Sequence, residues 1–167
     1  MTPVDGRRRF CRAWLGGMPL ALLAACAQPE RRPGAGAAHW SGRIQLRVQD
    51  PDAPQSFAAH FELHGSAQQG TLDLSSPWGT TLARLQWHPG QARLETSGGQ
   101  RTAASLQALL QEVTPAPLPV EALFDWLAGV ATAASGWEVD LQALNQGRLS
   151  AQRTAPAPAA LLRILLD

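Results

Sequence analysis

The segment from Arg43 to Gln49 constrains the fold of this chain more than any other, because polar and apolar residues alternate along it without a break. Successive side chains of a β-strand point to opposite faces. The period of two therefore predicts a strand with one buried and one solvated face.

The residues that follow extend this strand into an antiparallel meander. The turn-rich segment 50–54 leads to a second alternating segment at 57–64, and the two predict a hairpin. Shorter alternating segments separated by Gly, Pro and Ser residues predict more strands and turns. We expect strands at 71–75, 81–87 and 92–96, with turns at 76–79, 88–91 and 97–100.

The apolar period then changes to that of a helix. Leu106, Leu109 and Val113 have helical spacing after a possible cap at Ser105, and Pro115 ends the run. A second helix is expected from about Val120, with Gly129 as its terminator, and strand patterns resume afterwards. The late strands are expected at 137–141, 148–153 and 162–166, with a turn at 145–147. The pattern predicts an α+β fold, in which two short helices lie against the concave face of a curved antiparallel sheet.

The first 25 residues have the pattern of a signal peptide. A cluster of four arginines precedes the charge-free segment 13–25, which is too short to span a bilayer. Leu23-Ala24-Ala25-Cys26 resembles a bacterial lipobox, which implies cleavage before Cys26 and acylation of its thiol and new amine. The alternative is a buried free cysteine after an ordinary signal sequence. Segment 6–12 also resembles a twin-arginine signal, and Sec export remains open beside it.

The lipobox divides the chain into three parts. Residues 1–25 are the expected signal peptide, 26–39 the lipidated cysteine with a Pro/Gly/Ala-rich tether, and 40–167 the folded domain. Removal of the signal peptide leaves ten arginines and twelve acidic residues, a net charge of about −2. This charge disfavours nucleic acid as a partner.

No pattern typical of a catalytic or metal site is present in the sequence. There is no nucleophile elbow, Walker loop or dinucleotide fingerprint. His60, Glu62 and His64 are alternate residues of one predicted strand, nearly 7 Å apart, and therefore cannot close on one ion. We expect neither an enzyme nor a metal or other cofactor.

A set of short motifs in one order resembles the LolB family of outer-membrane lipoprotein receptors. The resemblance covers nearly the whole domain, although the segment between the second helix and the last strands is compressed and leaves the number of late strands open. The matching stretches are 40–43 (WSGR), 61–65 (FELHG), 74–79 (LSSPWG), 85–87 (LQW), 122–129 (ALFDWLAG), 136–139 (GWEV) and 162–167 (LRILLD).

This resemblance implies a half-open β-barrel whose mouth is covered by helices and which encloses an apolar cavity. The family accepts lipoproteins from the periplasmic carrier LolA and inserts them into the outer membrane. The resemblance thus implies a monomer that is lipid-anchored in the inner leaflet of the outer membrane and faces the periplasm. Ala27 after the lipidated cysteine is not the Asp that retains lipoproteins in the inner membrane, which agrees with this location.

Two groups of residues are the candidates for this function. The first is an apolar set expected to line the acyl-chain cavity, although each member could instead only pack in a core. It comprises Phe57, Phe61, Leu72, Leu74, Leu85, Trp87, Leu109 and Phe124. The second is the turn Pro77-Trp78-Gly79, which matches the family's membrane-insertion loop. Trp78 could instead fold back into the core. The alternative function is a structural or assembly lipoprotein with a filled core and no acyl-chain transfer.

Overall fold

The computed structural model describes residues 38–167 apart from 115 and 117. The expected signal peptide, Cys26 and the tether before residue 38 lie outside the described residues. The division of the chain at residues 25 and 39 therefore stays a prediction.

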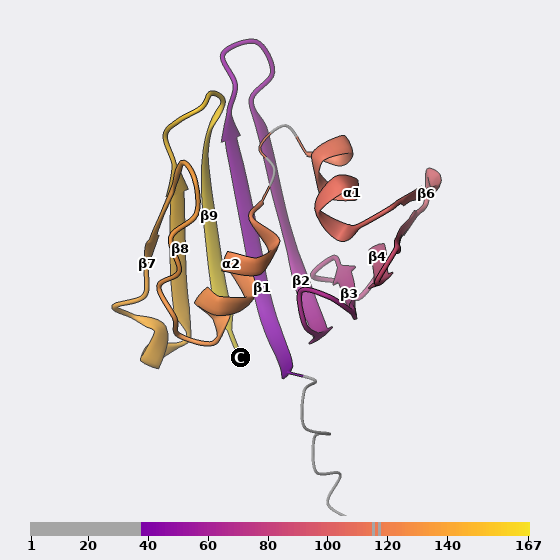
Figure 1. Cartoon of the computed structure of the whole chain (residues 1–167), viewed down its shortest axis with the longest axis horizontal. Coiled ribbons are helices and arrows are strands. Elements are labelled where there is room, and N and C mark those ends of the chain that lie inside the picture. Colours follow the sequence, from indigo (N-terminus) through magenta and orange to yellow (C-terminus); the bar gives the residue numbers. More distant parts are fainter. Residues whose placement is uncertain (1–37, 115, 117) are drawn as a thin grey trace, which may run out of the picture. The chain divides into compact units, whose positions relative to one another are not determined.

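The described residues form one curved antiparallel sheet of nine strands, in the order β6-β5-β4-β3-β2-β1-β9-β8-β7 (Figure 1). Strands β1 to β6 follow one another as a meander, and β9 returns to pair with the other side of β1. The strands are β1 (Ala38–Gln49), β2 (Gln55–Gly65), β3 (Gly70–Ser75), β4 (Thr81–His88), β5 (Gln91–Thr96), β6 (Gly99–Ala103), β7 (Trp137–Asp140), β8 (Arg148–Arg153) and β9 (Ala159–Leu166).

Strand β1 lies near the centre of the sheet, as its long alternating pattern suggests. Its polar residues occupy one face, and its apolar residues lie on the face that the helices cover. Gly42 lies on this apolar face with φ +149°, and a Cβ there would be 2.0 Å from the carbonyl oxygen of Leu165. Only glycine therefore permits the close approach of β1 and β9 at this point.

Two short helices cover the apolar face (Figure 1). Helix α1 (Leu106–Val113) begins as predicted at Ser105, whose Oγ accepts a hydrogen bond from the Ala108 N–H at 3.1 Å. Helix α2 (Val120–Leu127) ends at the cap Ala128, and Gly129 follows with φ +86°. Both helices therefore match their sequence signals at both ends.

The core lies between this sheet face and the helices. Its largest fully buried side chains are Trp126, Leu109 and Leu162, from α2, α1 and β9. The Trp126 indole N–H donates to the carbonyl oxygen of Thr132 at 2.8 Å, so its burial leaves no unpaired donor.

The structure corrects the sequence predictions at two strands. Strand β6 was not expected, because residues 97–100 read as a turn, whereas the strand already begins at Gly99. Only Ala103 of its five residues is apolar, so the strand shows no polar–apolar alternation from which it could be predicted. Strand β9 begins at Ala159, three residues before its predicted start, and the late strands number three, β7 to β9. A 3-10 helix, η1 (Leu144–Gln146), occupies the turn expected at 145–147.

Candidate functional site

The six predicted cavity residues of the sheet share its helix-covered face. Directly paired residues of neighbouring strands point to the same side. Phe61 pairs with Leu74, Leu72 pairs with Leu85, and Phe57 and Trp87 lie on this face in the same way. Leu109 and Phe124 approach the face from α1 and α2. The structure thus brings the eight candidates to one apolar layer.

Phe124 is the contact between α2 and the centre of this layer. Its ring lies 5.8 Å from that of Trp40 and 6.3 Å from that of Trp87, both edge-on. The Trp87 indole N–H donates to the carbonyl oxygen of Ser66 at 2.9 Å. Five candidates, Phe61, Leu85, Trp87, Leu109 and Phe124, are at most 9% exposed. These five side chains are therefore buried between the sheet and the helices.

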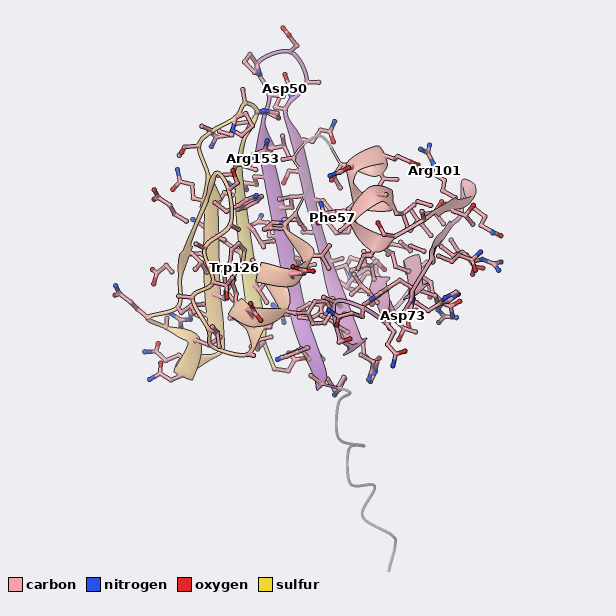
Figure 2. All side chains as sticks on the ribbon, viewed as in Figure 1. Asp50, Phe57, Asp73, Arg101, Trp126 and Arg153 are labelled. Atoms are coloured by element: carbon pink, nitrogen blue, oxygen red, sulfur yellow. The ribbon has the colours of Figure 1, made fainter. Side chains whose placement is uncertain are left out.

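Phe57 differs from the other candidates because 39% of its surface is exposed. It pairs with Leu46 of β1, which is only partly buried. In Figure 2, Phe57 lies between α1 and α2 over the sheet. The helices therefore cover the apolar face around Trp87 and leave it accessible to solvent at Phe57.

The loop between β3 and β4 holds Trp78 in solvent, with 89% of its surface exposed. The Gly79 N–H donates to the carbonyl oxygen of Ser76 at 2.9 Å, and the Ser76 N–H donates to that of Thr80 at 2.8 Å. Gly79 has φ +81°, a conformation that favours glycine. The alternative in which Trp78 folds back into the core is therefore wrong.

Arg153 is a buried residue that the sequence analysis missed. It pairs with Ala160 and Trp137 on the apolar face and is 7% exposed. Among the described residues its Nε has no hydrogen-bond partner. The sequence could have indicated its burial, because Leu149, Ala151 and Arg153 are alternate residues of one predicted strand. Arg153 therefore shares the face of two apolar residues.

A cluster of three polar residues lies on the opposite, outer face of the sheet. His39 joins Glu62 and His64 from the neighbouring strand, and one ligand atom of each residue lies within 4.8 Å of the others. The two imidazole rings are stacked, 4.2 Å apart and 10° from parallel. One ion cannot lie in both ring planes, as ligation by both histidines requires. We therefore assign no metal to this arrangement.

These features define a class of protein: a small α+β domain whose curved antiparallel sheet presents its apolar face to two short helices. The family model described as "Outer membrane lipoprotein LolB" matches residues 38–157. The chain belongs to this family.

Several relatives carry the name "Outer-membrane lipoprotein LolB". The protein of Bordetella petrii is 30% identical over 183 aligned residues, which cover 93% of this chain and 92% of the relative. That of Cupriavidus pinatubonensis is 30% identical over 95% of this chain and 87% of the relative. That of Bordetella pertussis is 35% identical over 72% of this chain and 63% of the relative.

The family confirms two predictions from the sequence. The resemblance of its motifs to the LolB family is confirmed, and the protein is an outer-membrane lipoprotein. Within the described part of the chain, we find no helix with the length and apolar character needed to cross a membrane.

Proposed function

We propose that this protein accepts lipoproteins from the periplasmic carrier LolA and inserts them into the outer membrane. The observation that carries the proposal is one apolar, helix-covered sheet face in a domain that also projects a tryptophan into solvent. The first feature suits acyl chains, and the second suits a membrane interface. Membership of the LolB family supports both assignments.

The physical requirement for such a protein is the cost of exposing acyl chains to water. Each methylene contributes about 0.8 kcal/mol, so three chains of about 15 methylenes cost on the order of 35 kcal/mol to expose. A lipoprotein therefore cannot cross the periplasm free in solution. Passage from one apolar cavity to another of similar chemistry keeps each step near zero in free energy. No catalytic group and no cofactor are needed, and we infer that the protein is not an enzyme.

Acyl chains need space between the sheet and the helices, where five of the eight candidates are buried. We infer that they enter at the exposed Phe57 and that α1 and α2 move away from the sheet as they do. The sheet then acts as the wall of a half-open barrel with the helices at its mouth. The eight candidates would contact the chains after that movement.

The anchor determines where the domain acts. We propose that residues 1–25 are removed, that Cys26 carries the acyl chains, and that the domain follows the tether as a monomer. The eleven residues 27–37 reach at most about 40 Å when fully extended. The domain would therefore stay close to the inner leaflet of the outer membrane, where its clients are delivered.

A transfer assay with the lipidated protein tests this proposal against the alternative of a structural lipoprotein. The protein is incubated with a LolA–lipoprotein complex, and the client is followed by co-purification. A fluorescent fatty acid tests acyl-chain binding separately. We expect the client to leave LolA and the fatty acid to compete with it. Retention of the client on LolA, with no fatty-acid uptake, would establish the filled-core alternative.

A further inference from the structure

The outer face of the central strands is basic, although residues 38–167 carry eight arginines against eleven acidic residues. The described residues of β1, β9 and β8 place no Asp or Glu on this face. They place four exposed arginines there, namely Arg43, Arg47, Arg163 and Arg148. Half of the eight arginines in the described residues therefore lie on the outer face of three adjacent strands.

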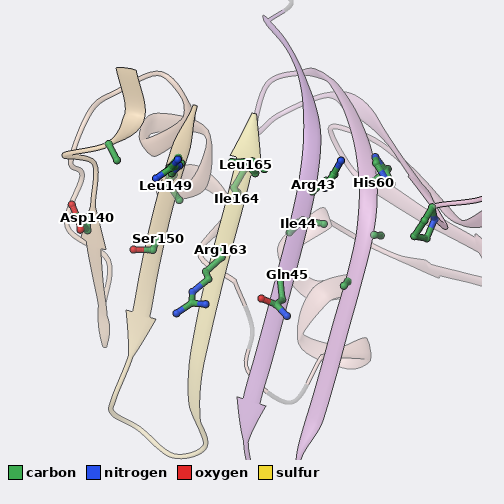
Figure 3. A pocket seen from close by; sticks show the side chains of 15 residues that line it. Arg43, Ile44, Gln45, His60, Asp140, Leu149, Ser150, Arg163, Ile164 and Leu165 are labelled. Atoms are coloured by element: carbon green, nitrogen blue, oxygen red, sulfur yellow. The ribbon is translucent and has the colours of Figure 1, made fainter. Parts of the chain in front are cut away.

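The strand register brings these arginines together with apolar side chains. Arg43 pairs with Leu165, which pairs in turn with Arg148, so Leu165 lies between two arginines in the strand register. Leu165 is 43% exposed. In the neighbouring row, Arg163 lies between Gln45 and Ser150 (Figure 3). The face thus combines positive charge, hydrogen-bonding groups and accessible apolar surface.

These residues line a groove of about 540 Å³, which we call the outer groove. Pro77 of the Trp78 loop lines it beside His60 of β2, and Asp140 and Ala143 line it beyond β8. The outer groove is therefore continuous with the loop that carries Trp78. Its full lining is Arg43, Ile44, Gln45, Ala58, Ala59, His60, Pro77, Asp140, Ala143, Arg148, Leu149, Ser150, Arg163, Ile164 and Leu165.

Within the part of the chain that the structure describes, the arginines of the outer groove form no ion pair. Elsewhere on the outer face, Arg84 forms an ion pair with Asp73, and Arg93 forms one with Glu95. Among the described residues, no carboxylate oxygen lies within 4.0 Å of a side-chain nitrogen of Arg43, Arg148 or Arg163. Their guanidinium donors are free to bind an external anion.

We propose that the outer groove binds the head group of an anionic phospholipid, such as phosphatidylglycerol, in the membrane that Trp78 enters. Guanidinium groups bind phosphate oxygens in bidentate fashion. The apolar surface at Leu165 suits the glycerol and upper acyl region of the same lipid. This inference rests on the proposed function for the position of Trp78 at the membrane.

The bound lipid gives the domain a defined orientation. The sheet would lie with its outer face toward the bilayer, and the face covered by α1 and α2 would point to the periplasm. The helices would then remain free to move when a client arrives. Attraction of the arginines to an anionic leaflet adds to the interface contact of Trp78 and weakens with salt.

The test uses the lipidated protein reconstituted in vesicles with an environment-sensitive thiol probe. Gln142→Cys places the probe beside the groove residue Ala143, and Gln111→Cys places it on the exposed side of α1. Vesicles of phosphatidylcholine are compared with vesicles that also contain phosphatidylglycerol. We expect lipid-phase quenching of the probe at position 142 only with phosphatidylglycerol, and none at position 111.

Two double variants, each lacking two arginines, distinguish binding in the outer groove from general electrostatic attraction of the protein to the vesicle. Arg43→Gln with Arg163→Gln should lower the ratio of docked to undocked protein roughly thirtyfold. Arg93→Gln with Arg101→Gln removes the same charge from β5 and β6 and should leave most docking intact. Equal quenching in both vesicle types, or equal loss in both double variants, would overturn the proposal.

The same variants distinguish this proposal from the transfer function. The docking assay contains neither client nor carrier, so it remains readable if the protein transfers no lipoprotein. Unchanged docking of the Arg43/Arg163 variant, together with slower uptake from LolA, would instead assign the groove to an acidic surface of the carrier. Loss of docking with normal uptake is the expected result.

Discussion

The rings of Trp87 and Phe124 lie 6.3 Å apart and meet edge-on, which joins the C-terminal end of strand β4 to helix α2. Trp87 is 4% exposed and Phe124 is 9% exposed. Trp126 of the same helix packs instead near Trp137 of β7. This contact therefore belongs to the core that holds α2 against the sheet.

Phe124→Ala should destabilise the protein by about 3–5 kcal/mol, because it leaves a cavity at the centre of the core. Denaturant unfolding followed by circular dichroism measures the loss. Phe57→Ala is the matched control, since the same change at a residue that is 39% exposed removes much less buried surface. A similar loss for both variants would contradict the central role of Phe124.

Phe57→Glu should slow uptake of acyl chains with little change in stability. A charge at the accessible part of the apolar face disfavours methylenes there, whereas Phe61→Asp or Leu85→Asp buries a charge and would also unfold the domain. Leu82→Glu is the control, because Leu82 is 37% exposed but does not lie on the helix-covered face. Uptake is measured by displacement of a bound fluorescent fatty acid when the client's acyl chains enter the protein. Normal uptake by Phe57→Glu would show that chains enter elsewhere.

Much of this fold could be predicted from the sequence because its signals are local. Strand β1 is predicted from the polar–apolar alternation of its own residues. The start of α1 is predicted from Ser105 and the residues just after it. Strand β6 was missed because it carries no apolar period of its own. Its pairing with β5, from Gly99 opposite Thr96 to Ala103 opposite Ala92, is visible only in the folded chain.

The surface features that the sequence did not predict depend on contacts between strands. His39 joins Glu62 and His64 only through the register of β1 and β2, so an argument about one strand could not include it. The outer groove likewise requires Arg43, Leu165 and Arg148 to lie in one row. The cavity candidates were easier to find, because alternation within each strand places them on the apolar face.

Arg153→Met should raise the free energy of unfolding by about 1–3 kcal/mol. The Arg153 Nε is a buried donor without a hydrogen-bond partner among the described residues, which opposes folding. An apolar side chain of similar length removes that penalty while preserving packing. The control is Arg101→Met, because Arg101 is exposed and its replacement should have little effect. Thermal and denaturant unfolding provide the comparison. A loss of stability in Arg153→Met would show that the guanidinium makes stabilising contacts in solution.

Cys26→Ser should abolish acylation and membrane attachment. The lipobox places the thiol of Cys26 at the cleavage site, and a serine hydroxyl at this position is not acylated by the lipoprotein pathway. Mass spectrometry of the mature N-terminus provides the measurement. An unmodified Cys26 in wild-type protein purified from membranes would refute lipid anchoring through this residue.

Trp78→Glu should leave uptake from LolA and thermal stability nearly unchanged while it slows release of the client into membranes. With 89% of its surface exposed, the indole makes little contact with the core, so its loss removes almost no folding energy. Burial of such a side chain in a bilayer is worth roughly 1.5–3 kcal/mol, and a carboxylate in its place opposes insertion.

Trp78→Leu keeps an apolar tip and should retain most of the release rate, which separates apolar insertion from a specific role of the indole. Release is measured as transfer of a labelled lipoprotein from the loaded protein to vesicles, and uptake as its removal from LolA. Equal loss of both steps in Trp78→Glu would show that the loop serves carrier recognition and that membrane insertion depends on another part of the domain.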